Sequence, residues 1–250
     1  MIASGTRPVV LVTGASSGIG AAAASALVAE GMVVHAAARR SERLAALRDA
    51  TGCETHVLDV CDAAGVAACV AEIGPIDILV NNAGLGRGWG SLANATYGDI
   101  EMTVATNVTA ALHLVQAVLP GMIERRRGHI INIGSMAGLY PLGSALYGAT
   151  KAAMHRLSTN LRIELQGTGV RVTEICPGRI DTEFYDVAID DPVERQAITN
   201  TGATGITAAE CADTITYAVT RAPHININRI ELQPTEQTYG GSHYVLEGKK

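Results

Sequence analysis

The sequence predicts an α/β fold: a single Rossmann-like, doubly wound parallel sheet of about seven strands with helices on both faces. Short apolar or β-branched runs alternate with Ala- and Leu-rich stretches of helical length along the whole chain. The predicted strands are apolar throughout, as expected where helices cover both faces of a sheet. Because repeated strand–helix–strand units with right-handed crossovers build a parallel sheet, we expect one domain spanning residues 1–250.

The individual elements follow in order from these runs. The predicted strands are Val9–Thr13, Val33–Ala37, Glu54–Leu58, Ile76–Val80, His129–Ile133, Val170–Ile175 and Arg229–Leu232. The predicted helices are Ile19–Glu30, Ser41–Ala50, Ala63–Glu72, Ile100–Pro120, Ser144–Leu165 and Ala208–Arg221. Two segments interrupt the alternation. The acidic segment 179–207 is expected to form a substrate lid, as long loops in compact domains often do, and the tail 235–250 to be ordered only by packing on another subunit.

Composition argues against several classes of function. The net charge is −5 and only 17% of residues are charged, so the chain lacks the basic stripe that nucleic-acid binding needs. No apolar stretch approaches the roughly 20 residues that span a bilayer, so we expect no membrane segment. The five cysteines form no CxxC pair, and the seven histidines have no metal-ligand spacing. We therefore expect a cytoplasmic protein with reduced thiols and no bound metal.

The first predicted strand runs directly into a glycine-rich turn, and a helix follows. The turn has the sequence Thr13-Gly14-Ala15-Ser16-Ser17-Gly18-Ile19-Gly20. Glycines let the backbone approach a pyrophosphate closely, and the amino terminus of the helix offers it free N–H groups. A plain strand–helix connection is the alternative, because the spacing differs from the commoner G-x-G-x-x-G. The strand–turn–helix context favours a dinucleotide site formed by Gly14, Ser16, Ser17, Gly18, Ile19 and Gly20.

The end of the second predicted strand indicates which dinucleotide binds. About 20 residues after the glycine turn, an NAD site usually has a carboxylate for the ribose 2′-hydroxyl. This chain has Ala38-Arg39-Arg40 there, and no acid. An arginine can hold a 2′-phosphate through charge-assisted hydrogen bonds, so we predict NADP(H) as the cofactor, bound by Arg39 and Arg40. The alternative is that both arginines are solvated residues at the start of a helix.

Polar residues also follow the third and fourth predicted strands. Asp59, before Val60, is placed to accept a hydrogen bond from the adenine amino group, although a simple turn or helix-capping aspartate is the alternative. Asn81-Asn82-Ala83-Gly84 would lock neighbouring loops and leave room for a ribose. We expect Asp59, Val60, Asn81, Ala83 and Gly84 to contribute to the cofactor site.

Three residues further along the chain have the chemistry for acid–base catalysis. Tyr147 and Lys151 are four residues apart in a helical run, which places them on one helix face. A phenol has a pKa of about 10, and a nearby ammonium lowers it by stabilising the phenolate. Ser135 ends the fifth predicted strand, at the sheet edge where ligands bind in such folds, and its hydroxyl would hold the substrate oxygen. A Y-x-x-x-K pair alone is a weak signal, but in this context it indicates a catalytic site.

Together these motifs resemble the short-chain dehydrogenase/reductase family over essentially the whole chain. The resemblance rests on the glycine turn, Asp59, Asn81-Asn82-Ala83-Gly84, Asn107, Ser135, Tyr147-x-x-x-Lys151 and Pro177-Gly178. It implies that Tyr147 is the general acid/base, that Ser135 polarises the carbonyl, and that Lys151 binds the nicotinamide ribose. It also implies a homotetramer and a proton-relay water at Asn107. The further cofactor contacts that it implies come from Tyr147, Lys151, Pro177, Gly178, Ile180 and Thr182.

Within this family the chain resembles the bacterial NADP-dependent 3-hydroxy acid (serine / L-allo-threonine) dehydrogenase branch. The resemblance is visible in Gly128-His-Ile-Ile-Asn-Ile-Gly-Ser135 and His224-Ile-Asn-Ile-Asn228, among other stretches. The branch implies oxidation of small β-hydroxy acids. Its lid arginine for the substrate carboxylate is absent, because Ala188 lies near the expected position. The candidate substrate residues are therefore the two cations beside the expected site, together with a lid tyrosine: Arg87, Arg179 and Tyr185. The alternatives are that Arg87 is a solvated loop residue and that Arg179 pairs with Asp181 or Glu183.

Two other functions remain open at this point. One is reduction of a sulfonated aldehyde or of a neutral ketone in secondary metabolism. The other belongs to a different class: a catalytically silent NADP-binding redox sensor. Intact Ser135, Tyr147 and Lys151 argue against the sensor, whereas the identity of the small-molecule substrate depends on the lid and its cations.

Overall fold

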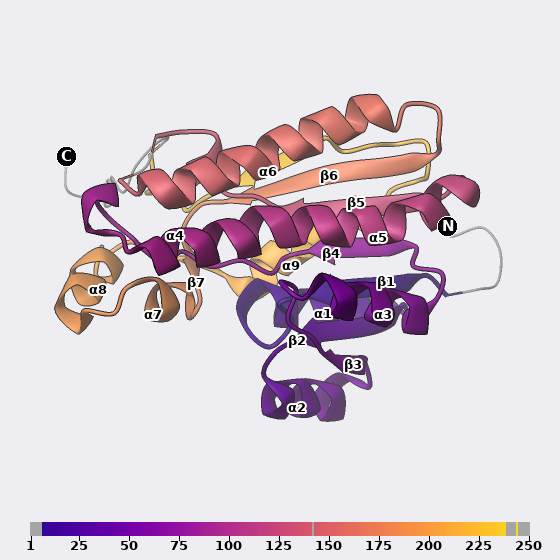
Figure 1. Cartoon of the computed structure of the whole chain (residues 1–250), viewed down its shortest axis with the longest axis horizontal. Coiled ribbons are helices and arrows are strands. Elements are labelled where there is room, and N and C mark those ends of the chain that lie inside the picture. Colours follow the sequence, from indigo (N-terminus) through magenta and orange to yellow (C-terminus); the bar gives the residue numbers. More distant parts are fainter. Residues whose placement is uncertain (1–6, 142, 239–243, 245–250) are drawn as a thin grey trace.

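The computed structural model describes residues 7–141, 143–238 and 244, and shows one large parallel sheet between layers of helices (Figure 1). The seven strands of this sheet lie in the order β3-β2-β1-β4-β5-β6-β9. All their pairings are parallel. The predicted fold class is confirmed. The strands are β1 (Val9–Thr13), β2 (Val33–Ala38), β3 (Glu54–Val57), β4 (Ile78–Asn81), β5 (Gly128–Ile133), β6 (Val170–Pro177) and β9 (Arg229–Leu232).

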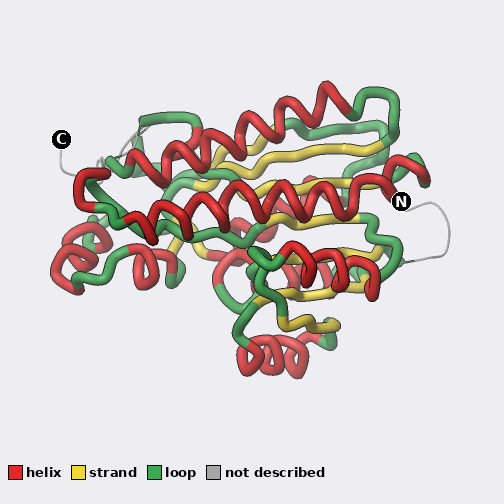
Figure 2. The backbone as a smooth tube through the Cα atoms, in the orientation of Figure 1, coloured by secondary structure: helices red, strands yellow, loops and turns green. Residues whose placement is uncertain are grey.

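Two apolar cores, one on each sheet face, hold the helices in place, and Figure 2 shows the helices as separate red segments around the yellow sheet. One core joins the sheet to α1 and α9, and includes Leu27 and Ile215. The other joins it to α3, α5 and α6, and includes Leu114 and Leu161. The helices are α1 (Gly18–Ala29), α2 (Ser41–Thr51), α3 (Ala63–Ile73), α4 (Tyr97–Val104), α5 (Ala110–Glu124), α6 (Ala145–Glu164), α7 (Phe184–Ala188), α8 (Pro192–Thr199) and α9 (Ala208–Val219). Strands that are apolar along their length meet both cores, which is why they lack alternation.

The helix expected at Ile100–Pro120 is longer than predicted and is interrupted. It begins at α4, where Thr96 and Asp99 form a reciprocal capping box. It then passes through a wider π-helical turn at Ala105–Thr109 before continuing as α5. The whole run Tyr97–Glu124 is long and apolar enough, by length and composition alone, to cross a membrane, which the sequence analysis did not expect. Its inner face packs against the sheet at Leu114 and its neighbours, whereas Met102, Val104 and Leu112 on its outer face are exposed.

The segment expected to be a long loop, 179–207, contains regular structure. A short strand β7 (Ile180–Asp181) pairs in parallel with β8 (Ile206–Thr207), and α7 and α8 lie between them. Helix α8 has a proline in its first turn and is capped by Asp191, whose side chain accepts from Val193 N. Figure 1 shows α7 and α8 beside the carboxyl ends of the strands, on the left. Most of the tail 235–250 lies outside the described residues.

Candidate active site

A cavity of about 480 Å³ lies at the carboxyl ends of β1, β4, β5 and β6, where the strand order changes direction between β1 and β4. Ligands bind at such switch points in doubly wound sheets. Most of the residues predicted from the sequence line this cavity: Gly14, Ser16, Ser17, Gly18, Ile19, Arg39, Arg40, Asp59, Val60, Ala83, Gly84, Ser135, Tyr147, Lys151, Pro177, Gly178, Arg179, Ile180, Thr182 and Tyr185. Four predicted residues are not in its lining: Gly20, Asn81, Arg87 and Asn107.

The glycine turn has the shape that close approach to a ligand requires. Gly14 has φ +66°, and a Cβ there would lie 2.9 Å from the Ala83 Cα. Gly20 does not line the cavity, because it faces the turn itself: a Cβ there would overlap the Asn82 amide. Ser17 precedes α1 without capping it through its side chain, so the first N–H groups of the helix are left for an anion. These features fit a bound pyrophosphate.

The two arginines after β2 lie at the same end of the cavity but differ in their partners. Arg40 donates to Ser16 Oγ at 3.0 Å and to Ser17 Oγ at 2.6 Å, and pairs with Glu183 at 3.2 Å. Arg39 lines the cavity and has no hydrogen bond or ion pair to any other described residue. A free guanidinium at this position fits a 2′-phosphate, whereas Arg40 is already engaged in holding the glycine turn to the lid segment.

Asn81 and Asn107 stabilise the walls of the cavity from behind. The Asn81 amide donates to Ala111 O at 3.3 Å and to Asn132 Oδ1 at 3.2 Å, so it ties β4 to its neighbours, while Asn82 lines the cavity in its place. Asn107 accepts from Leu85 N at 2.9 Å and donates to Leu85 O at 2.7 Å. The geometry therefore does not support a direct cofactor contact from the Asn81 side chain. The proton-relay role of Asn107, in the π-helical turn, stays a prediction.

Ser135, Tyr147 and Lys151 come together as the sequence predicts. The Tyr147 side chain is buried, which raises the pKa of its phenol, and a hydrogen bond to Ser135 opposes that rise. The Lys151 Nζ donates to Ile133 O at 2.8 Å and lies 5.8 Å from the Tyr147 ring centroid. Burial lowers the pKa of Lys151 to about 8. The expected lowering of the Tyr147 pKa by Lys151 is not found in this structure: burial raises that pKa, and the group that opposes the rise is Ser135.

Comparison with known proteins identifies the family. The model of the short chain dehydrogenase family matches residues 8–191. The chain belongs to the short-chain dehydrogenase family. The resemblance predicted from the motifs is thereby confirmed.

Relatives of this short-chain dehydrogenase match along nearly its whole length. It is 42% identical over 241 residues to the NADP-dependent 3-hydroxy acid dehydrogenase YdfG of Salmonella typhi, covering 93% of this chain and 97% of that protein. It is 40% identical to the serine 3-dehydrogenase of Rhizobium radiobacter, over 93% of this chain and 96% of that protein. A solved closed form of serine dehydrogenase complexed with NADP⁺ superposes with a TM-score of 0.88 at 41% identity, covering 93% and 97% of the two chains.

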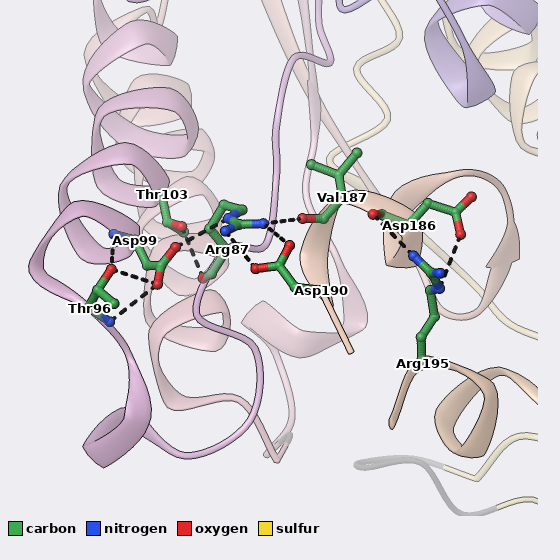
Figure 3. A network of polar contacts seen from close by, with 8 residues as sticks. All are labelled: Arg87, Thr96, Asp99, Thr103, Asp186, Val187, Asp190 and Arg195. Atoms are coloured by element: carbon green, nitrogen blue, oxygen red, sulfur yellow. Dashed lines mark hydrogen bonds and ion pairs between the residues drawn. The ribbon is translucent and has the colours of Figure 1, made fainter. Parts of the chain in front are cut away.

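The two cations expected at the substrate differ in how this short-chain dehydrogenase uses them. Arg87 donates to Asp190 at 2.6 and 2.9 Å and to Asp99 at 3.2 Å, and it also binds the Val187 carbonyl (Figure 3). The geometry does not support Arg87 as an anion site, because two carboxylates neutralise it and it does not line the cavity. Its contacts instead fasten the loop after β4 to α4 and to the lid segment.

Arg179 remains as a cation of the cavity lining. It donates to the carbonyls of Ile198 at 3.3 Å and Thr199 at 2.6 Å, and its side chain is only 10% exposed. Its Nε has no hydrogen bond among the described residues, although Asp181 Oδ1 lies 3.7 Å away. The carbonyl partners are uncharged, and the one carboxylate paired with Arg179 among the described residues, Asp181, is 57% exposed and lies at the long distance of 3.7 Å. Tyr185 also lines the cavity, and Arg179 opposes the rise that burial causes in the pKa of Tyr185.

Some residues of the site were missed by reasoning from the sequence alone. Asn82 lines the cavity and donates to Thr13 O at 2.8 Å, but its neighbour Asn81 was chosen. Trp89 and Phe184 also line the cavity, next to Tyr147. A signal was present for these two, because the chain contains a single tryptophan and a single phenylalanine. No group of three or more His, Cys, Asp or Glu side chains suited to a metal occurs among the described residues.

Proposed function

We propose that this short-chain dehydrogenase transfers a hydride between NADP(H) and a small hydroxy or carbonyl compound, with Tyr147 as the general acid/base. The proposal is carried by the meeting of predicted catalytic and cofactor-binding residues in one cavity. Ser135, Tyr147 and Lys151 meet in the same cavity as the glycine turn and the unpaired guanidinium of Arg39. A redox sensor without catalysis would not need the three catalytic side chains in this arrangement.

NADP(H) is the cofactor that the residues favour. No carboxylate follows β2, and Arg39 is free to bind a 2′-phosphate. The relative from Salmonella typhi is named as NADP-dependent, and the serine dehydrogenase neighbour was solved with NADP⁺. The glycine turn and the uncapped start of α1 would hold the pyrophosphate, and Lys151 the nicotinamide ribose. When bound, the nicotinamide supplies or accepts the hydride.

The catalytic side chains divide the proton chemistry among them. The Ser135 hydroxyl would hydrogen-bond the substrate oxygen and hold it beside the phenol of Tyr147. Because burial raises the pKa of Tyr147, the phenol is protonated at neutral pH and is ready to donate its proton to a carbonyl oxygen. In the direction of oxidation the same group must receive the alcohol proton as a phenolate. The Lys151 ammonium, charged below its pKa of about 8 and 5.8 Å from the Tyr147 ring centroid, would stabilise that phenolate once it forms.

The substrate we propose is a 3-hydroxy acid and its oxidised partner. Relatives at 40–42% identity are named for 3-hydroxy acids and serine. In this chain the carboxylate would bind Arg179, whose buried Nε lacks a hydrogen bond among the described residues. The segment 179–207 carries Arg179 and Tyr185 and would act as a substrate lid. Two other substrates compete with the 3-hydroxy acid. A sulfonated aldehyde would place its sulfonate at Arg179, whereas a neutral ketone would leave Arg179 without an anion.

We further propose a cytoplasmic homotetramer that uses the helices α4, α5 and α6 as an interface. Large apolar side chains are exposed on them at Met102, Leu112 and Ile163, which are 49%, 45% and 75% exposed. The small residues Ala110 and Ala111 of α5 are buried inside the chain and cannot contribute to the interface. Light scattering at micromolar concentration should give four times the mass of 25.9 kDa, and a monomer would contradict the proposal.

The experiment that tests the reaction is a screen of NADPH oxidation and NADP⁺ reduction over small carbonyls and hydroxy acids. We expect turnover with NADP(H), and higher kcat/KM for 3-hydroxy acids than for neutral alcohols of matched size. Binding of NADP(H) without turnover of any carbonyl would favour the redox sensor. Higher kcat/KM for neutral compounds would support the oxidoreductase activity but contradict a 3-hydroxy acid as the substrate.

A further inference from the structure

The aromatic residues of this chain gather at the active-site cavity. The chain has one tryptophan, one phenylalanine and seven tyrosines, only 4% of its residues. Six of these nine line the cavity: Trp89, Phe184, Tyr140, Tyr147, Tyr185 and Tyr244. Tyr147 has a catalytic role, but neither the hydride transfer nor the proton transfer calls for the others. Their concentration in an aromatic-poor chain indicates a role in binding.

Three of these residues form what we term the aromatic wall: Trp89, Phe184 and Tyr185. The Trp89 ring lies 5.5 Å from the ring of the catalytic Tyr147, and edge-on to Phe184 at 5.8 Å and to Tyr185 at 5.4 Å. Phe184 itself lies 5.2 Å from Tyr147. These centroid distances are those of favourable aromatic pairs. The wall therefore stands directly beside the phenol that exchanges a proton with the substrate.

The wall is assembled from two separate segments of the chain. Trp89 belongs to the loop after β4, whereas Phe184 and Tyr185 begin helix α7 of the lid segment. Phe184 fits only because residue 86 is glycine, since a Cβ there would lie 2.6 Å from the Phe184 Cζ. The ion pair of Arg87 with Asp190 joins the same two segments a few residues away, and the pair of Arg87 with Asp99 fastens the loop to α4 (Figure 3). The wall is thus held in place by packing and by charge.

The surface that the wall leaves open belongs to the cavity. Trp89, Phe184 and Tyr185 are each half-buried rather than fully buried, and all three line the cavity. An aromatic cluster that served only the core would have no such open surface. Covering apolar area that water otherwise wets is favourable, so the wall favours a substrate with an apolar surface next to its reacting carbon.

Charge in the cavity lining is separated from this wall. Arg87 is neutralised by Asp99 and Asp190 and lies outside the cavity lining, so of the two candidate cations Arg179 is the one that faces the cavity, with the exposed Asp181 at 3.7 Å. Arg179 lies 6.0 Å from the ring of Tyr244 and opposes the raised pKa of the Tyr185 phenol. Tyr185 thus links the two regions, because its ring packs in the wall and Arg179 is near enough to act on the pKa of its phenol. A substrate that uses both regions has an apolar group on one side of the carbinol carbon and an acid on the other.

We propose that the substrate of this enzyme carries an aromatic ring, or an apolar group of similar size, on its reacting carbon, and that Trp89 is the main residue that selects it. The inference rests on the proposed function, because it places the reacting carbon beside Tyr147. It extends that function by naming the substituent: a 3-aryl-3-hydroxy acid rather than a 3-hydroxy acid with a small polar substituent. A small polar substrate would leave the three rings in contact with water.

Four alcohols that vary the ring and the acid independently test this proposal. They are 3-hydroxybutanoate, 3-hydroxy-3-phenylpropanoate, 2-butanol and 1-phenyl-1-propanol, each assayed with NADP⁺. Burying a phenyl-sized group favours the transition state by roughly 10- to 100-fold, so the phenyl member of each pair should have the higher kcat/KM by that factor. Equal or lower values for both phenyl compounds would overturn the inference. If the neutral alcohols have higher kcat/KM than the acids, the 3-hydroxy acid assignment of the proposed function fails instead. The phenyl comparison and the acid comparison therefore fail separately.

Substitutions at Trp89 test whether the aromatic wall is the source of the preference for phenyl substrates. Trp89→Ala and the milder Trp89→Leu should remove most of the phenyl preference while leaving KM for NADP⁺ nearly unchanged. Tyr97→Ala is the matched control, because Tyr97 is 89% exposed and does not line the cavity. Retention of the full phenyl preference in both Trp89 variants would show that the wall does not select the substrate.

A binding measurement on the wild-type enzyme tests the proposal without turnover or variants. Trp89 is the only tryptophan, so its fluorescence reports on the wall alone. With NADP⁺ present, the unreactive 3-phenylpropanoate should change this fluorescence saturably, and butanoate should do so only at concentrations at least about tenfold higher. No change with 3-phenylpropanoate, or equal affinities for the two acids, would contradict the inference even if the Trp89 variants did not fold.

Discussion

Replacing Lys151 with methionine should make the folded protein more stable while it abolishes catalysis. Lys151 is 6% exposed, and burial lowers the pKa of its ammonium from 10.5 to about 8. That difference corresponds to a cost of about 3 kcal/mol for keeping the group charged in the fold at pH 7. The hydrogen bond from Nζ to Ile133 O, 2.8 Å long, offsets about 1 kcal/mol of this cost. We therefore expect Lys151→Met to raise the free energy of unfolding by about 2 kcal/mol at neutral pH.

The stability difference between the wild type and Lys151→Met should become smaller as the pH rises. Between pH 8 and 10.5 the lysine is protonated in the unfolded chain and largely neutral in the fold, so the unfolded state binds more protons there. Stability of the wild type therefore rises with pH across that window, and the advantage of Lys151→Met shrinks to nothing by its upper end. Burial raises the pKa of Tyr147, and removing a nearby cation cannot lower it, so the phenol stays protonated in both folded proteins over this range and its titration cancels.

Urea denaturation of both proteins at pH 7 and at pH 10 measures the difference. We expect the methionine variant to be the more stable at pH 7 and the two to converge at pH 10. A variant that is less stable at pH 7, or an advantage that does not change with pH, would refute the assignment of Lys151 as a buried cation kept for catalysis.

Three further changes have outcomes set by the structure. Arg39→Ala should lower kcat/KM for NADP⁺ by roughly 10- to 100-fold, because a charge-assisted hydrogen bond to the 2′-phosphate is lost, and should leave kcat/KM for NAD⁺ nearly unchanged. Arg48 is exposed and lies outside the cavity, so the control Arg48→Ala should change neither value. His155→Ala should lower the free energy of unfolding by about 2 kcal/mol in urea titrations, since it leaves the buried Glu174 carboxylate without its partner at 2.7 Å. Gly86→Ala should displace the lid phenylalanine and reduce turnover without weakening NADP⁺ binding, which steady-state kinetics and fluorescence titration would separate.

Much of the fold could be predicted because local patterns determine it. The central strands β1 and β4 are apolar on both sides, and the strand–turn–helix start places Gly14 and Gly18 where only glycine suits a positive φ. The binding site for the 2′-phosphate could also be predicted from local sequence, since Arg39 directly follows β2. The pair Tyr147 and Lys151 depends only on helical spacing, and the structure keeps both on one turn of α6.

What could not be predicted depends on contacts between distant segments. Arg87 was expected to face the substrate, but Asp190, which lies 103 residues later in the chain, neutralises it. Burial of Tyr147 under Trp89 and Phe184 raises its pKa, and no local spacing encodes that burial. The helices α7 and α8 are too short to show clear periodicity, so their segment resembled a loop.

The most direct test of the central claim is the rate of NADP⁺ reduction by Tyr147→Phe with the best hydroxy acid of the screen. The change removes only the hydroxyl that exchanges the proton, and keeps the ring packed against Trp89 and Phe184. We predict a loss of about 10²–10⁴-fold in kcat, with the dissociation constant of NADP⁺, measured by Trp89 fluorescence, nearly unchanged. A variant that binds NADP⁺ and retains more than about a tenth of the wild-type rate would contradict the account.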